Sequence, residues 1–286
     1  MKQVKGIDLH FWGVRGTCPT PGPHTAIYGG NTPCVEARVG SHRVMFDAGT
    51  GLRVAGEKEF SGNQEWIIFL SHFHWDHIQG FPLFMPLFVP RNRIIVYGEL
   101  RDDASAEVVM RHQMSYPCFP VELPNIAAEF EFRHVVDGDV IRIGNASVRA
   151  RAINHPGGCL SYRVNHGGRS IVYATDTEPL TDEPDPVLVK HSKNADCLIY
   201  DACYTDQEYE GIVPPKRVGW GHSTWKKGVE VARAAGVKKL VLFHHDPSHD
   251  DEMIAGIERH CRIVMKNSVA ARDGLEISFR AKPRKK

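Results

Sequence analysis

The feature that most constrains the fold is a run of metal-binding side chains directly behind an apolar strand. Residues 66–70 (WIIFL) are all apolar, which is typical of a strand buried on both faces. The next seven residues read Ser-His-Phe-His-Trp-Asp-His. Side chains two positions apart share a side of an extended chain, so we expect His72 and His74 to converge on one point. Asp76 and His77 follow at once, and we expect them to face a second point nearby.

Imidazole and carboxylate groups together are ligands suited to Zn²⁺, and also to Mn²⁺ or Fe²⁺. This segment supplies only two ligands for each point, so a complete site needs more ligands from elsewhere. Three later residues each follow a predicted strand: His155, Asp176 and His244. Neighbouring strands hold their end residues side by side, which favours convergence at one sheet edge. Asp176 is the natural carboxylate to bridge two ions.

The rest of the chain alternates between strand-like and helical patterns. The further predicted strands are residues 7–14, 35–39, 44–47, 94–97, 130–136, 147–153, 160–164, 170–174, 197–201, 239–243 and 275–279. The predicted helices are residues 103–114, 186–191, 224–235 and 251–259. This order favours two packed sheets with helices outside them, in the α/β class. We expect one domain over residues 1–280, followed by a solvated basic tail over residues 281–286.

Composition excludes several other classes of protein. The chain has 286 residues, and 35 basic against 34 acidic side chains give a formal charge of +1. This balance argues against a protein built to coat nucleic acid or a membrane. No run approaches the roughly 18 apolar residues of a membrane span, and no signal-type segment opens the chain, so we expect a cytoplasmic protein. The seven cysteines form no C-x-x-C pair, so a metal site would be completed by carboxylates.

Residues 81–90 (FPLFMPLFVP) form an unusual apolar segment. Pro82 and Pro86 interrupt it, so a regular helix is not expected there. We expect a buried irregular segment or a lid. If the segment were exposed, it would be a candidate surface for a homodimer.

The order of the candidate ligands, His72-x-His74-x-Asp76-His77 followed by His155, Asp176 and His244, resembles the metallo-β-lactamase fold superfamily of metallohydrolases. The resemblance implies a four-layer αββα sandwich of two mixed sheets, with the active site along one edge. It also implies a binuclear site that holds two divalent ions, Zn²⁺ first and Mn²⁺ or Fe²⁺ as alternatives. In this arrangement His72, His74 and His155 bind one ion, Asp76, His77 and His244 bind the other, and Asp176 is shared.

A second motif points to one branch of that superfamily. Gly221-His222-Ser223-Thr224 opens a predicted helix that leads to the strand ending at His244. This order looks like the phosphodiesterase branch, which includes tRNA 3′-end endonucleases, cyclic-phosphate diesterases and cyclic-nucleotide phosphodiesterases. The resemblance implies that His222 touches the phosphate or protonates the leaving oxygen. We therefore expect a phosphodiesterase in which Asp76 and His222 are catalytic and a metal-bound hydroxide attacks a small cyclic or nucleotide-like phosphodiester.

Several alternatives stay open at this point. A thioester or other acyl hydrolase similar to glyoxalase II shares the ligand motif, although we find no helical C-terminal domain of that type. An RNA-processing nuclease is less favoured, because no Gly/Pro-rich arm is present to grip tRNA. A non-catalytic binding module would be expected to lack a ligand, and none is missing.

Other residues near these motifs are candidates for supporting roles. Asp47 is expected to orient a ligand histidine through its second ring nitrogen, and Asp201 is expected to pair with His222. Arg15 is a candidate phosphate contact. Trp75 and Trp220 are candidates for stacking on a base, which is worth about 1–3 kcal/mol. The expected partner is a small phosphodiester, with nucleic acid not favoured and no membrane.

Overall fold

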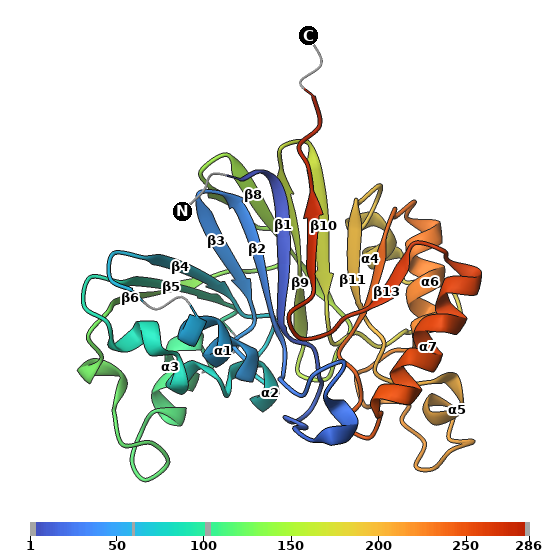
Figure 1. Ribbon diagram of the computed structural model, residues 1–286, viewed down its shortest axis with the longest axis horizontal. Helices are drawn as coiled ribbons and strands as arrows, with labels where there is room; N and C mark the ends of the chain where they lie inside the picture. The colour runs from blue at the N-terminus through green and yellow to red at the C-terminus, as the bar shows by residue number, and fades with distance from the viewer. Residues whose placement is uncertain (1–3, 59–60, 101–103, 284–286) are drawn as a thin grey trace.

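The computed structural model describes residues 4–58, 61–100 and 104–283. Two seven-stranded sheets pack face to face, and helices cover the outer face of each sheet (Figure 1). The predicted four-layer sandwich of two mixed sheets is therefore confirmed. That residues 1–280 form one domain stays a prediction.

The first sheet combines an antiparallel half and a parallel half. In spatial order it consists of β14 (Glu276–Phe279), β1 (Val4–Gly13), β2 (Cys34–Gly40), β3 (His42–Phe46), β4 (Glu65–Phe69), β5 (Arg93–Gly98) and β6 (Glu129–His134). Pairing is antiparallel from β14 to β3 and parallel from β3 to β6. The parallel strands β3 and β4 thus end at the same edge.

The second sheet repeats this plan. In spatial order it consists of β13 (Ser268–Ala270), β12 (Leu240–Phe243), β11 (Cys197–Asp201), β10 (Arg169–Ala174), β9 (Cys159–His166), β8 (Ala146–Ile153) and β7 (Val140–Ile143). Pairing is antiparallel from β7 to β10 and parallel from β10 to β13. Strands β8, β10, β11 and β12 therefore run in one direction, which brings their carboxyl ends to one edge of the sheet.

Amphipathic helices complete the outer layers. Helices α1 (Thr50–Lys58) and α3 (Ala106–Gln113) bury Leu52 and Met110 against the first sheet. Helices α4 (Pro186–His191), α6 (Trp225–Ala234) and α7 (Asp251–Val264) bury Leu188, Val231 and Ile257 against the second sheet. Two short helices, α2 (Trp75–Ile78) and α5 (Asp206–Tyr209), lie at the lower end of the molecule in Figure 1.

Aromatic rings fill the space between the sheets near the site. The ring of Phe46 stacks on the rings of Tyr162 and Tyr173, with centroids 5.7 and 5.3 Å apart. A buried tyrosine hydroxyl needs a hydrogen-bond partner. The Tyr162 hydroxyl donates to the Leu70 carbonyl at 2.6 Å and the Tyr173 hydroxyl to Asp47 at 2.7 Å. The apolar core is thus tied directly to the loops that carry the candidate ligands.

All the predicted strands are present, with ends that differ by a few residues, whereas strands β7 and β13 and helices α1, α2 and α5 were not predicted. Strands β7 and β13 are short, and α1 contains Gly51 and Gly56, which are poor helix formers. A Cβ atom on Gly56 would lie only 2.7 Å from the Phe84 ring. Helix α1 therefore owes its place to close packing against this ring rather than to local propensity.

Residues 81–90 form two short 3-10 helices, Phe81–Leu83 and Met85–Phe88. The side chains of Phe81, Phe84 and Leu87 are fully buried under the first sheet, whereas Leu83 and Met85 are exposed. The predicted buried irregular segment is therefore confirmed.

The predicted basic tail, residues 281–286, lies only partly within the described residues. Residues 281–283 belong to no helix or strand, and residues 284–286 of the predicted tail lie outside the described residues. In the part of the chain that the structure describes, no helix has the length and apolar character needed to cross a membrane.

The core predicts a clear contrast between two isoleucines. Ile199 in β11 is fully buried between the sheets, whereas Ile263 in α7 is 80% exposed. We expect Ile199→Ala to lower the free energy of unfolding by about 2–5 kcal/mol, and Ile263→Ala to change it by about 0.5 kcal/mol or less. Urea denaturation measures both. Equal losses in the two variants would contradict the assignment of the core.

Candidate metal centre

Three candidate residues lie at the first or second position after a strand and turn the chain sharply. Asp47 follows β3, Asp176 follows β10 and His244 follows β12, with φ angles of 62°, 47° and 61°. Left-handed backbone is uncommon outside glycine, although Asp and His tolerate it better than most residues. Such conformations concentrate at functional sites, where the surrounding structure compensates for the strain.

The four ligands predicted first lie where β4 leaves the first sheet. His72 and His74 are on the extended loop after β4, and His74 precedes α2 with φ −61° and ψ 151°. Asp76 and His77 are both buried in the single turn of α2. The change from extended chain to helix gives the two pairs different directions, as the spacing predicted.

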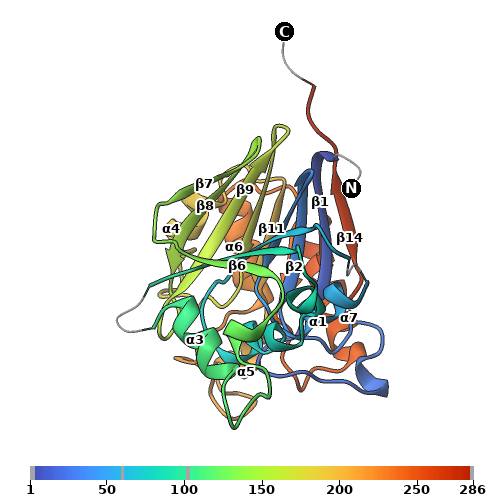
Figure 2. The ribbon, with the colours of Figure 1, turned by 90° about the vertical axis from the view of Figure 1, so that its left-hand side faces the viewer.

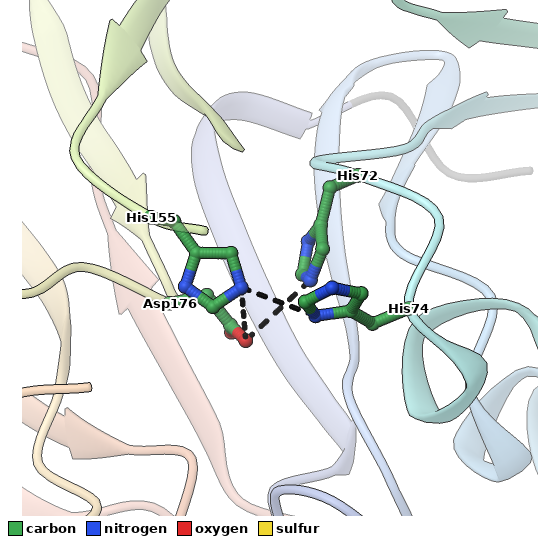
Figure 3. Close-up of side chains that lie close together, drawn as sticks. All are labelled: His72, His74, His155 and Asp176. Atoms are coloured by element: carbon green, nitrogen blue, oxygen red, sulfur yellow. Dashed lines mark hydrogen bonds and ion pairs between the residues drawn. The ribbon is translucent and has the colours of Figure 1, made fainter. Parts of the chain in front are cut away.

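One group of candidate ligands joins the two sheets (Figure 3). The ligand atoms of His72, His74, His155 and Asp176 all lie within 4.8 Å of one another. The His155 Nε2 atom lies 3.1 Å from His74 Nδ1 and 3.9 Å from Asp176 Oδ2, and His72 Nε2 lies 3.6 Å from the same oxygen. The first sheet contributes His72 and His74, and the second contributes the other two.

A second group lies on the other side of Asp176. His77 Nε2 and His244 Nε2 lie 3.3 Å apart. Each also lies 3.2 Å from Asp176 Oδ1 and within 3.3 Å of Asp76 Oδ2. Asp176 thus offers one carboxylate oxygen to each group, which is the geometry that a shared ligand requires.

The donor set fits two divalent cations. His72 Nε2 is buried with no hydrogen-bond partner among the described residues, although such atoms are nearly always satisfied in proteins. The nitrogens of His77 and His244 face each other and two carboxylates, where a cation would satisfy all four groups. Imidazole nitrogens and carboxylate oxygens are ligands that Zn²⁺, Mn²⁺ and Fe²⁺ accept. That these seven residues bind metal stays a prediction.

Charges in the centre shift the protonation of its members. Burial would raise the pKa of Asp76, but the neighbouring His77 and His244 hold it well below its usual value. Burial would lower the pKa of His77, but Asp176, Asp76 and Asp47 raise it well above its usual value. In the absence of cations, the carboxylates therefore stay ionised and draw protons onto this histidine.

Asp47 supports the centre from behind. One of its carboxylate oxygens lies 2.7 Å from His77 Nδ1, and it also accepts hydrogen bonds from Ser71 and Tyr173. A carboxylate that takes the Nδ1–H leaves the Nε2 lone pair of the imidazole for a metal. The structure therefore places Asp47 where the predicted orienting role requires it.

His222 lies beside the centre, as expected from the second motif. Its Nδ1 is 3.0 Å from Asp201 Oδ2 and 3.9 Å from Asp176 Oδ2, and its ring stacks on His244 with centroids 4.8 Å apart. Burial would lower the pKa of His222, but Asp201 and then Asp176 outweigh it and raise the pKa to about 9. These carboxylates therefore favour the protonated form of the His222 imidazole.

A supporting residue that the sequence did not reveal is Glu178, which is buried behind the loop that carries His222. Its carboxylate accepts hydrogen bonds from the Tyr209 hydroxyl at 2.8 Å and from the N–H groups of Gly219 and Gly221 at 2.5 and 2.8 Å. The Gly221 carbonyl in turn lies 2.8 Å from His155 Nδ1. Only its position two residues after Asp176 could have indicated it.

Two glycines, Gly16 beside Arg15 and Gly221 in the second motif, are explained by close contacts. A Cβ atom on Gly16 would lie 2.4 Å from His244 Nδ1, and one on Gly221 would lie 2.4 Å from His155 Nδ1. Gly221 also has a φ of 89°, which only glycine adopts readily. Both positions let backbone pass directly behind a candidate ligand ring.

Of the remaining candidates, Arg15 is buried, whereas the rings of Trp75 and Trp220 are exposed. Arg15 is fully buried, and its guanidinium donates to the carbonyls of Gly29, Asp246 and His249. These bonds join distant segments, so Arg15 has a structural role and not the expected phosphate contact. Trp75 is 64% and Trp220 is 52% exposed. Trp75 lies between His74 and Asp76 in the sequence, and Trp220 lies two residues before His222.

The arrangement around Asp47 predicts an effect on metal affinity. We expect Asp47→Asn to weaken binding of divalent metal by about 10–100-fold, because His77 loses the charged partner of its Nδ1–H. Titration against a chromogenic chelator measures this affinity. The exposed Asp182 provides a matched control, and Asp182→Asn should bind metal as the unaltered protein does. Unchanged affinity in Asp47→Asn would contradict the orienting role.

The chain is similar over most of its length to known ribonuclease Z proteins. Ribonuclease Z from Picrophilus torridus is 26% identical over 316 aligned positions, which cover 95% of this chain and 96% of that protein. Ribonuclease Z from Pyrococcus furiosus is 24% identical and covers 85% of this chain, with 87% of its own length matched.

Solved structures show the same fold. The human tRNase Z, short form, has a TM-score of 0.68 at 20% identity, with 95% of this chain and 98% of that chain covered. A diphosphatase from the PhnP family has a TM-score of 0.70 at 21% identity, with 96% and 98% covered. The profile of the Beta-lactamase superfamily domain matches residues 42–245, well over half of the chain. The chain therefore belongs to the beta-lactamase superfamily.

Proposed function

We propose that this protein is a binuclear metal-dependent phosphodiesterase. The observation that carries the proposal is the position of His222, which Asp201 holds beside the ligand cluster, with its ring stacked on His244 and its Nδ1 3.9 Å from Asp176. A phosphodiester has charged oxygens to bind and a basic leaving oxygen to protonate.

In this proposal His72, His74 and His155 hold one ion, the second group holds the other, and Asp176 is shared. Zn²⁺ is the preferred ion, with Mn²⁺ and Fe²⁺ as alternatives. When bound, such a pair supplies Lewis acidity toward phosphoryl oxygens and lowers the pKa of water.

The protein's own groups then bind and orient the substrate. Asp201 accepts the Nδ1–H of His222, which leaves Nε2–H as the group that donates to the phosphate or to the departing oxygen. Asp201 itself is fixed by the N–H groups of Thr177 and Cys203, at 3.1 and 3.0 Å. Asp76 is oriented by the N–H of Thr17 at 2.8 Å. These bonds hold the acid and a ligand in place before substrate arrives.

The proposed substrate is a small cyclic or nucleotide-like phosphodiester. The exposed rings of Trp75 and Trp220 are available to stack on a base. A second candidate is processing of RNA ends, which is favoured by the ribonuclease Z relatives that match most of the chain. Precursor tRNA and 2′,3′-cyclic nucleotides, assayed side by side, separate the two candidates.

The proposal predicts turnover of a simple diester. We expect the protein loaded with Zn²⁺ or Mn²⁺ to hydrolyse bis(p-nitrophenyl) phosphate, and to do so far faster than a thioester. Release of p-nitrophenolate measures the reaction, and Asp76→Ala, which removes a ligand, serves as the inactive control. Absence of diester turnover with both metals, or preference for the thioester, would refute the proposed function.

The role of His222 predicts a dependence on the leaving group. We expect His222→Ala to lower kcat/KM by about 10²–10⁴-fold for a diester with an alkoxide leaving group, which needs a proton. The loss should be much smaller for p-nitrophenolate, which departs without one. The exposed His260 in α7 offers a control, since His260→Ala should affect neither substrate. Equal losses for the two substrates would assign His222 to phosphate binding rather than to proton donation.

A further inference from the structure

Helix α4 packs beside β8 on the outer face of the second sheet (Figure 2), and residues of these elements line a second concave site. Its volume is about 780 Å³, within the range of about 300–1,000 Å³ that is common for pockets that bind small ligands. Its walls come from β8, β9 and the segment from α4 to Asn194. No candidate metal ligand lines it, so this pocket is separate from the metal centre.

The pocket is strongly basic. Its lining includes the cationic side chains of Arg149, Arg151, Arg163, Lys190 and Lys193. Arg151 pairs with Asp137, and Arg163 donates to the backbone carbonyls of residues 191 and 193. Among the described residues, the other three cations have no ion-pair partner. The pocket therefore gathers positive charge that the protein itself does not neutralise.

A buried polar atom in the wall is also unsatisfied. His191 is only 6% exposed, and its Nε2 has no hydrogen-bond partner among the described residues. Burial, and then the charges of Arg163, Arg151 and Arg149, lower the pKa of His191 to about 4. A neutral imidazole held among arginines is suited to donate a hydrogen bond to an anion that enters the pocket.

We propose that this pocket binds a nucleoside diphosphate or a closely similar small phosphate ester, at a site distinct from the metal centre. The phosphate oxygens are contacted by Arg149, Lys190 and Lys193. Hydrogen bonds from cationic side chains to phosphate are stronger than those between neutral groups. His191, whose Nε2 is buried and has no partner among the described residues, donates from that atom. Pro186 and Val187 provide an apolar edge for the rest of the ligand.

The concave shape favours a small ligand over a nucleic acid chain. An extended backbone is bound by charges along an open surface, whereas His191, which lines this pocket, is only 6% exposed. The proposal does not depend on the phosphodiesterase reaction, because none of its residues belongs to the metal centre.

The test uses adenosine diphosphate and the metal-loaded protein. Calorimetry measures affinity, and hydrogen–deuterium exchange of residues 186–194 shows whether binding occurs at this pocket rather than at the metals. We expect Arg149→Glu/Lys190→Glu to weaken this binding by about tenfold or more and to abolish the local protection. Hydrolysis of bis(p-nitrophenyl) phosphate should be unchanged.

Arg142→Glu/Lys266→Glu is the matched control, because it makes the same change in charge at two exposed residues outside the pocket. It should bind adenosine diphosphate as the unaltered protein does. Equal weakening in both double variants, or no protection of residues 186–194 in the unaltered protein, would overturn the proposal. The pocket variant Arg149→Glu/Lys190→Glu should also be tested with a single-stranded RNA decamer. If that variant lost RNA binding but bound adenosine diphosphate unchanged, the proposal would be overturned in favour of an RNA-binding surface.

Discussion

The carboxylate of Asp176 is the point on which the whole arrangement depends. It lies in a left-handed turn at the end of β10, with one oxygen 3.2 Å from His77 and His244 and the other 3.6 Å from His72. These histidines come from both sheets. The sandwich must therefore bring two separate sheet edges into register within a few tenths of an ångström, or the ligands would not meet.

Several side chains that are not candidate ligands help to hold the two sheet edges in this relative position. Tyr173, in β10 and three residues before Asp176, joins the core to Asp47 through a hydrogen bond, and Asp47 joins the end of β3 to His77. Glu178 holds the loop that carries His222 and supports His155. Without any one of these groups, the candidate ligands would be free to move apart. A binuclear site requires their precise placement.

Much of this could be predicted from the sequence, because the decisive signals are local. Spacing of two in an extended chain predicts that His72 and His74 converge, and the position of Asp176 and His244 after apolar strands places them at a sheet edge. The supporting roles were harder to predict. Arg15 is buried by carbonyls from residues 246 and 249, more than 200 positions away, and no local pattern indicates such contacts. The basic pocket is equally hidden, since its arginines and lysines are scattered over three elements and the total charge is only +1.

The central claim is that Asp176 is shared by two metal ions. The most direct test is a crystal of the zinc-loaded protein measured at the zinc absorption edge. The account predicts two anomalous peaks, both in contact with Asp176, one beside His72, His74 and His155 and one beside Asp76, His77 and His244. A single peak, or a peak away from Asp176, would contradict it.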